Sequence, residues 1–436
     1  MEELIPLDIS NGAITQKFKE ETNVEVETAK GLRNVNEGKK AQFILNSLLQ
    51  YFLSFICIIL FIQGCLILVT TQFITKKIYF QNSIHAKTNL QIVLNQTKRS
   101  FIILLLSILS IISPTKIRIT TDNRTMDPNS IFLKDNGEPL GALQMNSIII
   151  SNHQLYIDWI IIWWMAHISN LSTNFFIILK KSLQNLPILG YGMNNFRFIF
   201  MNRKWKLDQS YLKEQLYQIN HNAMMMTPIP NGKKNEIEKK IINKDSDPWG
   251  YNLLIFPEGT NLCSNGIKKN LQYCHMINKK PFKNVLLPHI TGLKFMIENL
   301  NPSLTCLYDF TIGYSGINGK NGDHEFADTL YSLKNIFLKG KGPRMIDIYI
   351  RSYKINQIPI NNVENFQNWL FNLWQEKDAL LTKYYQIGSF QDFNNENTTT
   401  TLINNGIDMN PNEFASAVFV PFGLSIFIIV AYWFAF

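Results

Sequence analysis

Two long apolar stretches, one toward each end of the chain, predict helices that cross a membrane. Residues 41–75 contain no charged side chain, and residues 43–69 are dense in Leu, Ile and Phe. About 20 apolar residues are enough for a helix to span the hydrocarbon core. Residues 414–436 are also uncharged, and Tyr432 and Trp433 near their end suit the lipid–water interface. We therefore expect one transmembrane helix within residues 41–75 and a C-terminal transmembrane helix at residues 414–436.

Shorter segments border these two stretches. Residues 101–112 are apolar but too few to cross a bilayer unaided, so they predict a re-entrant or interfacial helix. Residues 41–118 together form the expected N-terminal membrane segments. Residues 1–40 are polar with mixed charges and little periodicity, which predicts a disordered tail. Residues 391–413, rich in Asn and Thr from residue 394, predict a linker.

The middle of the chain, residues 119–390, carries a different pattern. Short apolar runs of strand length alternate with stretches of helical periodicity, such as residues 206–219 and 363–385. This alternation predicts an α/β domain with a mixed sheet flanked by helices. In the last strand Ile346, Ile348 and Ile350 alternate with polar residues, so we expect one wet face there. The predicted strands cover residues 147–150, 175–179, 196–201, 253–256, 284–287, 307–312 and 345–350.

Composition narrows the class of protein. Hydrophobic residues make up 46% of the 436 residues, charged residues only 17%, and the mean hydropathy is -0.04. These values favour a water-facing domain held by a few apolar segments over a polytopic transporter. The net charge of +9 suits an anionic partner, but no zinc finger, RNP-type motif or basic zipper points to nucleic acid. Residues 231–248, rich in Lys, Asn and Asp, predict a surface insertion.

His153 and Asp158 form the first candidate for chemistry. They follow the predicted strand at 147–150 and precede an apolar helical stretch. Five helical residues would place the two side chains about 140° apart, so they can meet only if the chain turns at a strand-to-helix corner. A carboxylate on one imidazole nitrogen leaves the other nitrogen free to act as a base. The alternative is a loop histidine beside an aspartate that stabilises a helix start.

Two further strand ends carry polar chemistry. One predicted strand leads into a tight turn of five residues, in which Pro presets a backbone dihedral and Gly permits a close backbone approach. The turn consists of Phe256, Pro257, Glu258, Gly259 and Thr260. Another strand delivers Arg203 to its end, where a guanidinium can hold a phosphate through two hydrogen bonds. The alternatives are an ordinary turn and a solvated basic strand end.

Taken together, these pieces resemble the glycerolipid acyltransferase family. Its four sequence blocks are a His-x4-Asp pair, an apolar run that ends in Arg, the sequence Phe-Pro-Glu-Gly-Thr, and an apolar run closed by Pro. They are matched, in family order, at His153 and Asp158, Arg203, residues 256–260 and Pro288. One departure is His289, where the family pattern would place Arg after the proline. Residues around Asn152, residues 198–205, 308–316 and 374–378 are similar to the branch that contains lysocardiolipin and lysophosphatidylinositol acyltransferases.

The resemblance implies an integral membrane enzyme that transfers an acyl group from acyl-CoA to a lysophospholipid. It implies His153 as base, Asp158 as its support, Arg203 and the Gly259–Thr260 turn as the phosphate site, and Glu258 as a group that orders it. Asn152, Phe256, Pro257 and Pro288 are carried over as further substrate-binding positions. It also implies no bound cofactor and no metal, with acyl-CoA as co-substrate, the bilayer as partner, and an endoplasmic reticulum location with the domain facing the cytosol.

Two other functions remain open from the sequence. A membrane-bound lipid esterase or hydrolase needs a nucleophile, usually Ser in G-x-S-x-G. Residues 313–316 lack the second spacer of that motif, and Ser151 lies outside any such elbow. A non-catalytic lipid-binding membrane protein would be indifferent to changes at His153 and Asp158. Hydrolysis of acyl-CoA without an acceptor separates the first alternative from a transferase.

Overall fold

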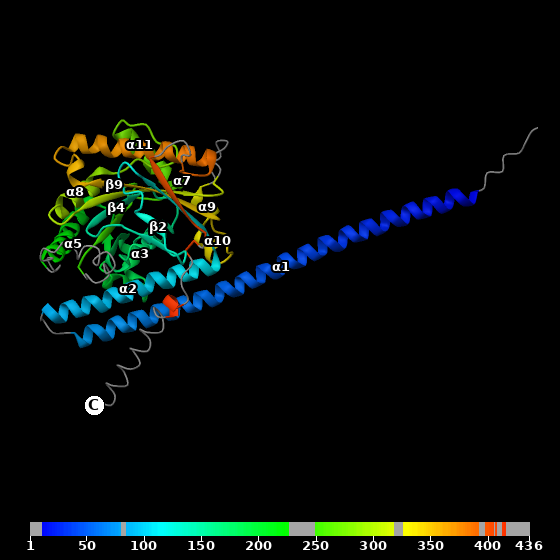
Figure 1. Ribbon diagram of the computed structural model, residues 1–436, viewed down its shortest axis with the longest axis horizontal. Coiled ribbons are helices and arrows are strands. Elements are labelled where there is room, and N and C mark those ends of the chain that lie inside the picture. The colour runs from blue at the N-terminus through cyan, green and yellow to red at the C-terminus, as the bar shows by residue number, and fades with distance from the viewer. Residues whose placement is uncertain are drawn as a thin grey trace, which may run out of the picture.

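The computed structural model describes residues 11–79, 84–225, 249–317, 326–391, 397–404, 406–407 and 412–415, with side chains from Lys40 onward except those of residues 41, 84, 85 and 225. Two long helices run beside an α/β domain (Figure 1). The domain is built on an eight-stranded mixed sheet in the order β10-β1-β9-β8-β4-β7-β5-β6. The strands are β1 (Lys116–Asp122), β4 (Ser147–Ser151), β5 (Phe175–Lys180), β6 (Ile199–Met201), β7 (Asn252–Ile255), β8 (Cys306–Tyr314), β9 (Met345–Lys354) and β10 (Thr398–Ile403). A separate hairpin pairs β2 (Ile131–Leu133) with β3 (Pro139–Gly141).

Parallel pairing sets the position of the site. Strands β8, β4, β7, β5 and β6 are mutually parallel, whereas β9 runs antiparallel to β8 and β10 runs antiparallel to β1. The carboxyl ends of the five parallel strands therefore lie along one edge of the sheet. Ligands in open α/β sheets bind outside such an edge.

Helices cover both faces of the sheet. On one face Ile149 packs with α2 (Ile84–Ile112) and α3 (Asp158–Ile168), and on the other Ile148 and Ile150 pack with residues of α5, α8 and α11. All five residues of β4 are buried, as expected for a strand enclosed on two sides. The helices of the second face are α5 (Trp205–Met225), α8 (Ile290–Leu300) and α11 (Val363–Ile387). The shorter helices are α4 (Leu189–Asn195), α7 (Ser264–Met276), α9 (Ala327–Leu330) and α10 (Leu333–Phe337).

The two N-terminal helices are long and apolar enough to cross a membrane. Helix α1 (Asn11–Ile78) contains the candidate span Gln42–Ile78, and α2 contains the candidate span Ala86–Ile112. Little of the first span is buried within the protein, whereas most of the second is, because α2 lies between α1 and α3. Phe101 of α2 contacts both neighbours, with ring centroids 6.3 Å from Phe61 and 6.1 Å from Trp163. The 101–112 run is thus the end of a 29-residue helix rather than a short interfacial one.

The structure changes two of the expectations for the chain ends. Residues 11–40 continue the helix of α1 where a disordered tail was predicted, since they lack proline and extending a helix costs less than starting one. The predicted linker 391–413 contains β10, whose Thr residues have a branched β-carbon that favours an edge strand. Residues 1–10, the 231–248 insertion and residues 416–436 of the predicted C-terminal helix lie outside the described residues.

Two strand predictions were also wrong. Residues 284–287 begin in a bend and pair with no strand in the described part of the chain. The backbone N–H and side-chain amide of Asn284 are held instead by Asp378 and Thr382 of α11. Strand β9 has no wet face, because α11 covers the polar side of the strand. Asp347, Tyr349 and Arg351 are buried beneath that helix together with its Trp374 and Lys377.

Candidate active site

A strand-to-helix corner brings His153 and Asp158 together, as the sequence predicted. Strand β4 ends at Ser151, α3 begins at Asp158, and the turn between them leaves His153 Nδ1 2.9 Å from Asp158 Oδ2. With a carboxylate as its partner, Nδ1 carries the proton and Nε2 presents a lone pair. The face of the imidazole stacks on Phe256, with ring centroids 4.1 Å apart. The ring is thus fixed in both orientation and tautomer.

The carboxylate of Asp158 is buried, and both of its oxygens accept hydrogen bonds. Its Oδ2 also accepts the backbone N–H of Gln154 at 2.7 Å and that of Leu155 at 3.0 Å, and its Oδ1 accepts the hydroxyl of Tyr314. Burial, with the neighbouring carboxylate, raises the pKa of Tyr314 well above its ordinary value, so the phenol stays a donor. These bonds hold the carboxylate toward His153. The sequence did not identify Tyr314, which lies 156 residues away.

The 256–260 turn fastens a second strand end beside this pair. Gly259 N–H donates to Phe256 O at 3.0 Å, and Gly259 adopts φ +72°, a conformation that favours glycine. Leu262 N–H donates to the carbonyl of His153 at 2.7 Å, which connects the chain after the turn to the His153–Asp158 corner. Gly259 and Thr260 line the same cavity as His153.

Glu258 points away from this cavity into the protein. Its Oε1 accepts from Trp374 Nε1 of α11 at 3.2 Å, and its Oε2 has no hydrogen-bond partner among the described residues. Burial raises its pKa to about 8, against the opposing effect of the Trp374 bond and the Lys377 charge. Glu258 is therefore a neutral acid near pH 7 that anchors the turn to α11.

Arg203 follows β6 and reaches the same cavity with its guanidinium. Its φ of +64° is unusual for a residue with a side chain. Asp208 at the start of α5 stabilises this corner by accepting the N–H groups of Asn202 and Lys204, both at 2.9 Å. Burial raises the pKa of Asp208, but hydrogen bonds from the corner outweigh it and hold that pKa below its ordinary value. The Arg203 side chain is exposed and has no hydrogen-bond or ion-pair partner in the described part of the chain.

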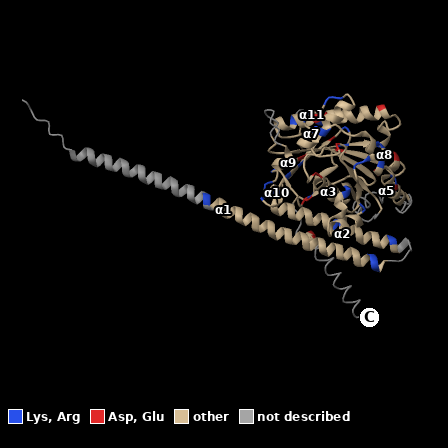
Figure 2. Ribbon diagram, turned by 180° about the vertical axis from the view of Figure 1, so that it is seen from behind, with Lys and Arg blue, Asp and Glu red and all other residues tan. Residues whose placement is uncertain are grey.

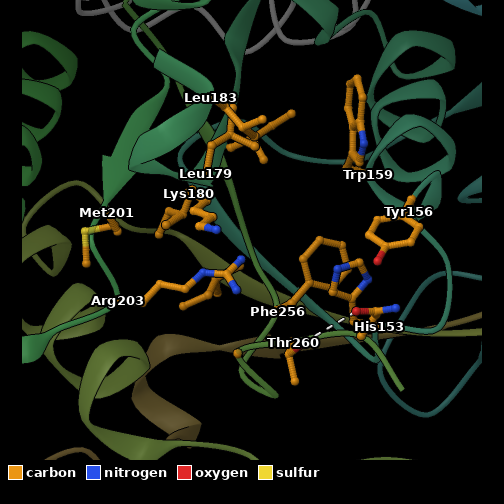
Figure 3. Close-up of a pocket in the computed structure, with 15 residues that line it drawn as sticks. His153, Tyr156, Trp159, Leu179, Lys180, Leu183, Met201, Arg203, Phe256 and Thr260 are labelled. Atoms are coloured by element: carbon orange, nitrogen blue, oxygen red, sulfur yellow. Dashed lines mark hydrogen bonds between the residues drawn. The ribbon is translucent and has the colours of Figure 1, made fainter. Parts of the chain in front are cut away.

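One cavity of about 570 Å³ joins these groups (Figure 3). His153, Phe256, Gly259, Thr260 and Arg203 line it, and Tyr156 and Trp159 of the α3 corner form another wall. Lys180 at the carboxyl end of β5 also lines it and supplies a second cation that the sequence did not single out. Its place at the end of a parallel strand was the available signal. Ile177, Leu179 and Leu183 give the cavity an apolar side.

Besides Glu258, three predicted substrate-binding positions do not line this cavity. The Asn152 amide bridges the backbone of β8, donating to Ile312 O at 3.0 Å and accepting from Ile312 N at 2.8 Å. Pro257 starts the tight turn, and Pro288 is buried directly after residues 284–287. Their positions support the loops that carry the site. Among the described residues no cluster of three His, Cys, Asp or Glu side chains is placed to hold a metal ion.

Comparison with known proteins agrees with these features. The family model described as "Acyltransferase" matches residues 134–314, and the one described as "Acyltransferase C-terminus" matches residues 336–407. The chain is 44% identical over 344 residues to the 2-acyl-1-lysophosphatidylinositol acyltransferase of Saccharomyces cerevisiae, covering 77% of this chain and 85% of the relative. It is 27% identical over 243 residues to mouse lysocardiolipin acyltransferase 1, covering 55% of this chain and 54% of the relative.

Proposed function

The chain belongs to the glycerolipid acyltransferase family, and we propose that it esterifies a lysophospholipid, of the lysophosphatidylinositol or lysophosphatidic acid type, with the acyl group of acyl-CoA. The observation that carries this proposal is the His153–Asp158 pair on the wall of a cavity that also receives Arg203. The cavity therefore offers a base for the hydroxyl of the acceptor, a cation for its phosphate and an apolar wall for its acyl chain.

The proposed reaction uses His153 as a general base. Nε2 takes the proton of the lysophospholipid hydroxyl while its oxygen attacks the thioester carbonyl of acyl-CoA. The carbon–sulfur bond then breaks, and the imidazolium returns the proton to the departing thiolate. Because thiols ionise near pH 8.5, the thiolate leaves without a separate strong acid. Asp158 stabilises the imidazolium while it carries the extra proton.

Arg203 is the proposed contact for the acceptor phosphate. A guanidinium matches the geometry of two phosphate oxygens, and here it has no competing carboxylate in the described part of the chain. Lys180 adds positive charge to the same cavity, while Ile177, Leu179 and Leu183 offer an apolar surface to an acyl chain. The acyl-CoA donor is anionic, so these cations also suit its approach.

The helices α1 and α2 fit an enzyme whose lipid substrates dissolve in a bilayer. We propose that they anchor the domain in the endoplasmic reticulum membrane, the usual home of the family, with the cavity on the cytosolic side, where acyl-CoA is found. Lysophospholipid and product then exchange with the bilayer, and coenzyme A leaves into water.

The test is an in vitro assay of purified protein with labelled acyl-CoA. We expect labelled phospholipid to form with lysophosphatidylinositol or lysophosphatidic acid, and release of coenzyme A to depend on the acceptor. Equal coenzyme A release without acceptor would indicate a hydrolase instead. No turnover of any lysophospholipid would contradict the proposal.

Arg203→Ala should weaken binding of the acceptor in this assay. Loss of a hydrogen-bonded ion pair with phosphate costs about 1.5–3 kcal/mol, so the acceptor KM should rise roughly tenfold or more. Lys204→Ala is the matched control, since Lys204 is an exposed neighbouring cation that does not line the cavity. An acceptor KM that is the same in Arg203→Ala and Lys204→Ala would contradict the phosphate assignment.

A further inference from the structure

A second cavity, of about 560 Å³, adjoins the one that contains His153. Met201, Arg203, Gly259 and Thr260 line both cavities, so the Arg203 guanidinium and the glycine turn form their common boundary. His153 lines only the first. The second extends between α7 and α8, with Lys269, Asn270 and Tyr273 on one side and His289, Thr291 and Gly292 on the other.

The chemistry of a phosphodiester explains why such a site has two cavities. A phosphodiester carries two organic arms on one phosphorus, and its two remaining oxygens bear the charge. If Arg203 holds those oxygens at the boundary, one arm extends toward His153 and the other must extend into the second cavity. In a lysophospholipid the first arm is the glycerol with its free hydroxyl, and the second is the headgroup alcohol.

We propose that the second cavity binds the headgroup alcohol of the acceptor and that it is built for an uncharged polyol such as inositol. This inference rests on the proposed function. It assigns the choice of headgroup to residues of α7 and α8, outside the His153–Asp158 corner.

The polar groups of this cavity fit hydroxyls better than a cationic headgroup. Lys269 is exposed at the cavity and would repel an ammonium group. Of the two carboxyl groups on its wall, Asp208 is engaged by the backbone of the Arg203 corner. Glu258 is engaged through one oxygen by Trp374, and burial raises its pKa to about 8, so it is neutral near pH 7. Neither one offers a free negative charge to choline or ethanolamine.

Two features suit a ring of hydroxyls in particular. Asn270 is nearly buried, and its Oδ1 accepts from Cys274 at 3.4 Å, which leaves its Nδ2 as a donor with no partner among the described residues. Tyr273 and His289 lie with ring centroids 4.3 Å apart and present apolar ring surface beside it. His289, which stands where the family pattern would place Arg, thus belongs to the second cavity and leaves the phosphate to Arg203.

Gly292 provides a direct test. A β-carbon built on Gly292 meets no atom within 4 Å, so a large side chain there would enter the cavity without a clash at its base. Gly292→Phe should lower the ratio of kcat/KM for lysophosphatidylinositol to kcat/KM for lysophosphatidic acid tenfold or more, because only the first has a headgroup alcohol. Thr291→Phe, at an exposed position of the same wall, should act in the same direction.

The control is Leu271→Phe, which adds an aromatic ring on an exposed position of α7 that lines neither cavity. A change in the ratio smaller than tenfold in both Gly292→Phe and Thr291→Phe, with Tm values close to that of the control, would overturn the inference. Wild-type protein that acylates lysophosphatidic acid but shows no preference for lysophosphatidylinositol would overturn it too, while the proposed function stands. Wild-type protein that acylates neither would remove both.

Discussion

At the scale of single residues, Glu258 shows how burial changes the protonation state of a side chain in the 256–260 turn. A carboxyl group with one bond to Trp374 and an unpartnered oxygen cannot be buried cheaply as an anion. It therefore keeps its proton in the folded protein, with a pKa of about 8 instead of its ordinary 4.5. In that state it acts as a neutral anchor between the turn and α11.

This state predicts a pH dependence of stability. Because the folded pKa of Glu258 lies above its unfolded value, its contribution is complete below about pH 4.5 and is lost as the pH rises toward 8. Glu258→Gln keeps a neutral hydrogen-bonding group of the same size. The variant should therefore lose less stability than wild type between pH 5 and 8, as measured by Tm in detergent. If Tm falls equally with pH in wild type and Glu258→Gln, Glu258 is not neutral in the folded protein, and the assignment is contradicted.

The residue scale also shows which parts of the site a sequence can reveal. His153 and Asp158 are five residues apart, so strand and helix patterns around them sufficed to predict their contact. Tyr314 and Asp208 act through the fold. Tyr314 reaches Asp158 from β8, the strand next to β4 in the sheet but 156 residues away in the chain. Asp208 supports a backbone corner whose positive φ no pattern predicts. Asn152 was assigned to substrate, but its amide is used within the protein by β8.

At the scale of elements, α11 is joined to the sheet by buried charges. Asp309 of β8 accepts from Lys377 Nζ of α11 at 2.7 Å and from Arg351 of β9 at 2.7 and 3.1 Å. Burial alone would raise the pKa of Asp309, but the charges of Lys377 and Arg351 hold it below its ordinary value. Lys377 also donates to Phe310 O of β8, and Glu376 of α11 accepts from Arg351 of β9, so the helix is fixed in register over two strands.

Lys377→Met should destabilise the protein by about 3 kcal/mol, since it leaves a buried carboxylate short of one partner. The double variant with Asp309→Asn should lose less unfolding free energy than the sum of the losses in the two single variants. A buried charge is destabilising mainly when its partner has been removed. Denaturant unfolding of the two single variants and the double variant in detergent measures this coupling. Lys294→Met, which removes the exposed pair with Glu298, should cost less than about 1 kcal/mol. Additive losses at Lys377 and Asp309 would contradict the description of the cluster.

The apolar pattern of the sequence predicted some helices and strands better than others. Strands β4, β5, β7 and β8 and helices α5 and α11 lie where apolar patterning placed them, since each has an apolar side that must be covered. The pattern misled at residues 345–350, because alternation of Ile with polar residues normally marks a wet face. Here the polar side binds α11 through ion pairs. This contact depends on a helix that starts 13 residues after that strand run and packs back across it. The edge strand β10 was missed because its Thr-rich sequence also suits a linker.

At the scale of the whole molecule, an apolar helix pair adjoins a domain with charges on its surface. Figure 2 shows Lys and Arg at the ends of the apolar part of α1, with Lys76 and Lys77 in its last turn, and other charged residues spread over the domain. Large apolar side chains are exposed along residues 43–73 of α1, including Phe52, Phe55 and Leu60. Exposed apolar surface of this length has its natural cover in lipid.

We therefore expect the protein to stay in the membrane pellet after alkaline carbonate extraction. Leu60→Arg places a charge near the middle of the Gln42–Ile78 span, which costs about 2.5–3.5 kcal/mol at the centre of a membrane helix. The pellet fraction should fall for this variant. Met276→Arg, on an exposed end of α7, should leave the fraction unchanged. Release of the wild-type protein by carbonate would contradict a spanning α1.

The central claim is that His153 removes the proton of the acceptor hydroxyl. Its most direct test is the initial rate of acyl transfer from acyl-CoA to lysophosphatidylinositol by purified His153→Ala protein. The control is His275→Ala, which changes an exposed histidine that lines neither cavity. A lost general base should lower the rate about a hundredfold or more while the protein accumulates and inserts normally. A His153→Ala rate within tenfold of the His275→Ala rate would contradict the account.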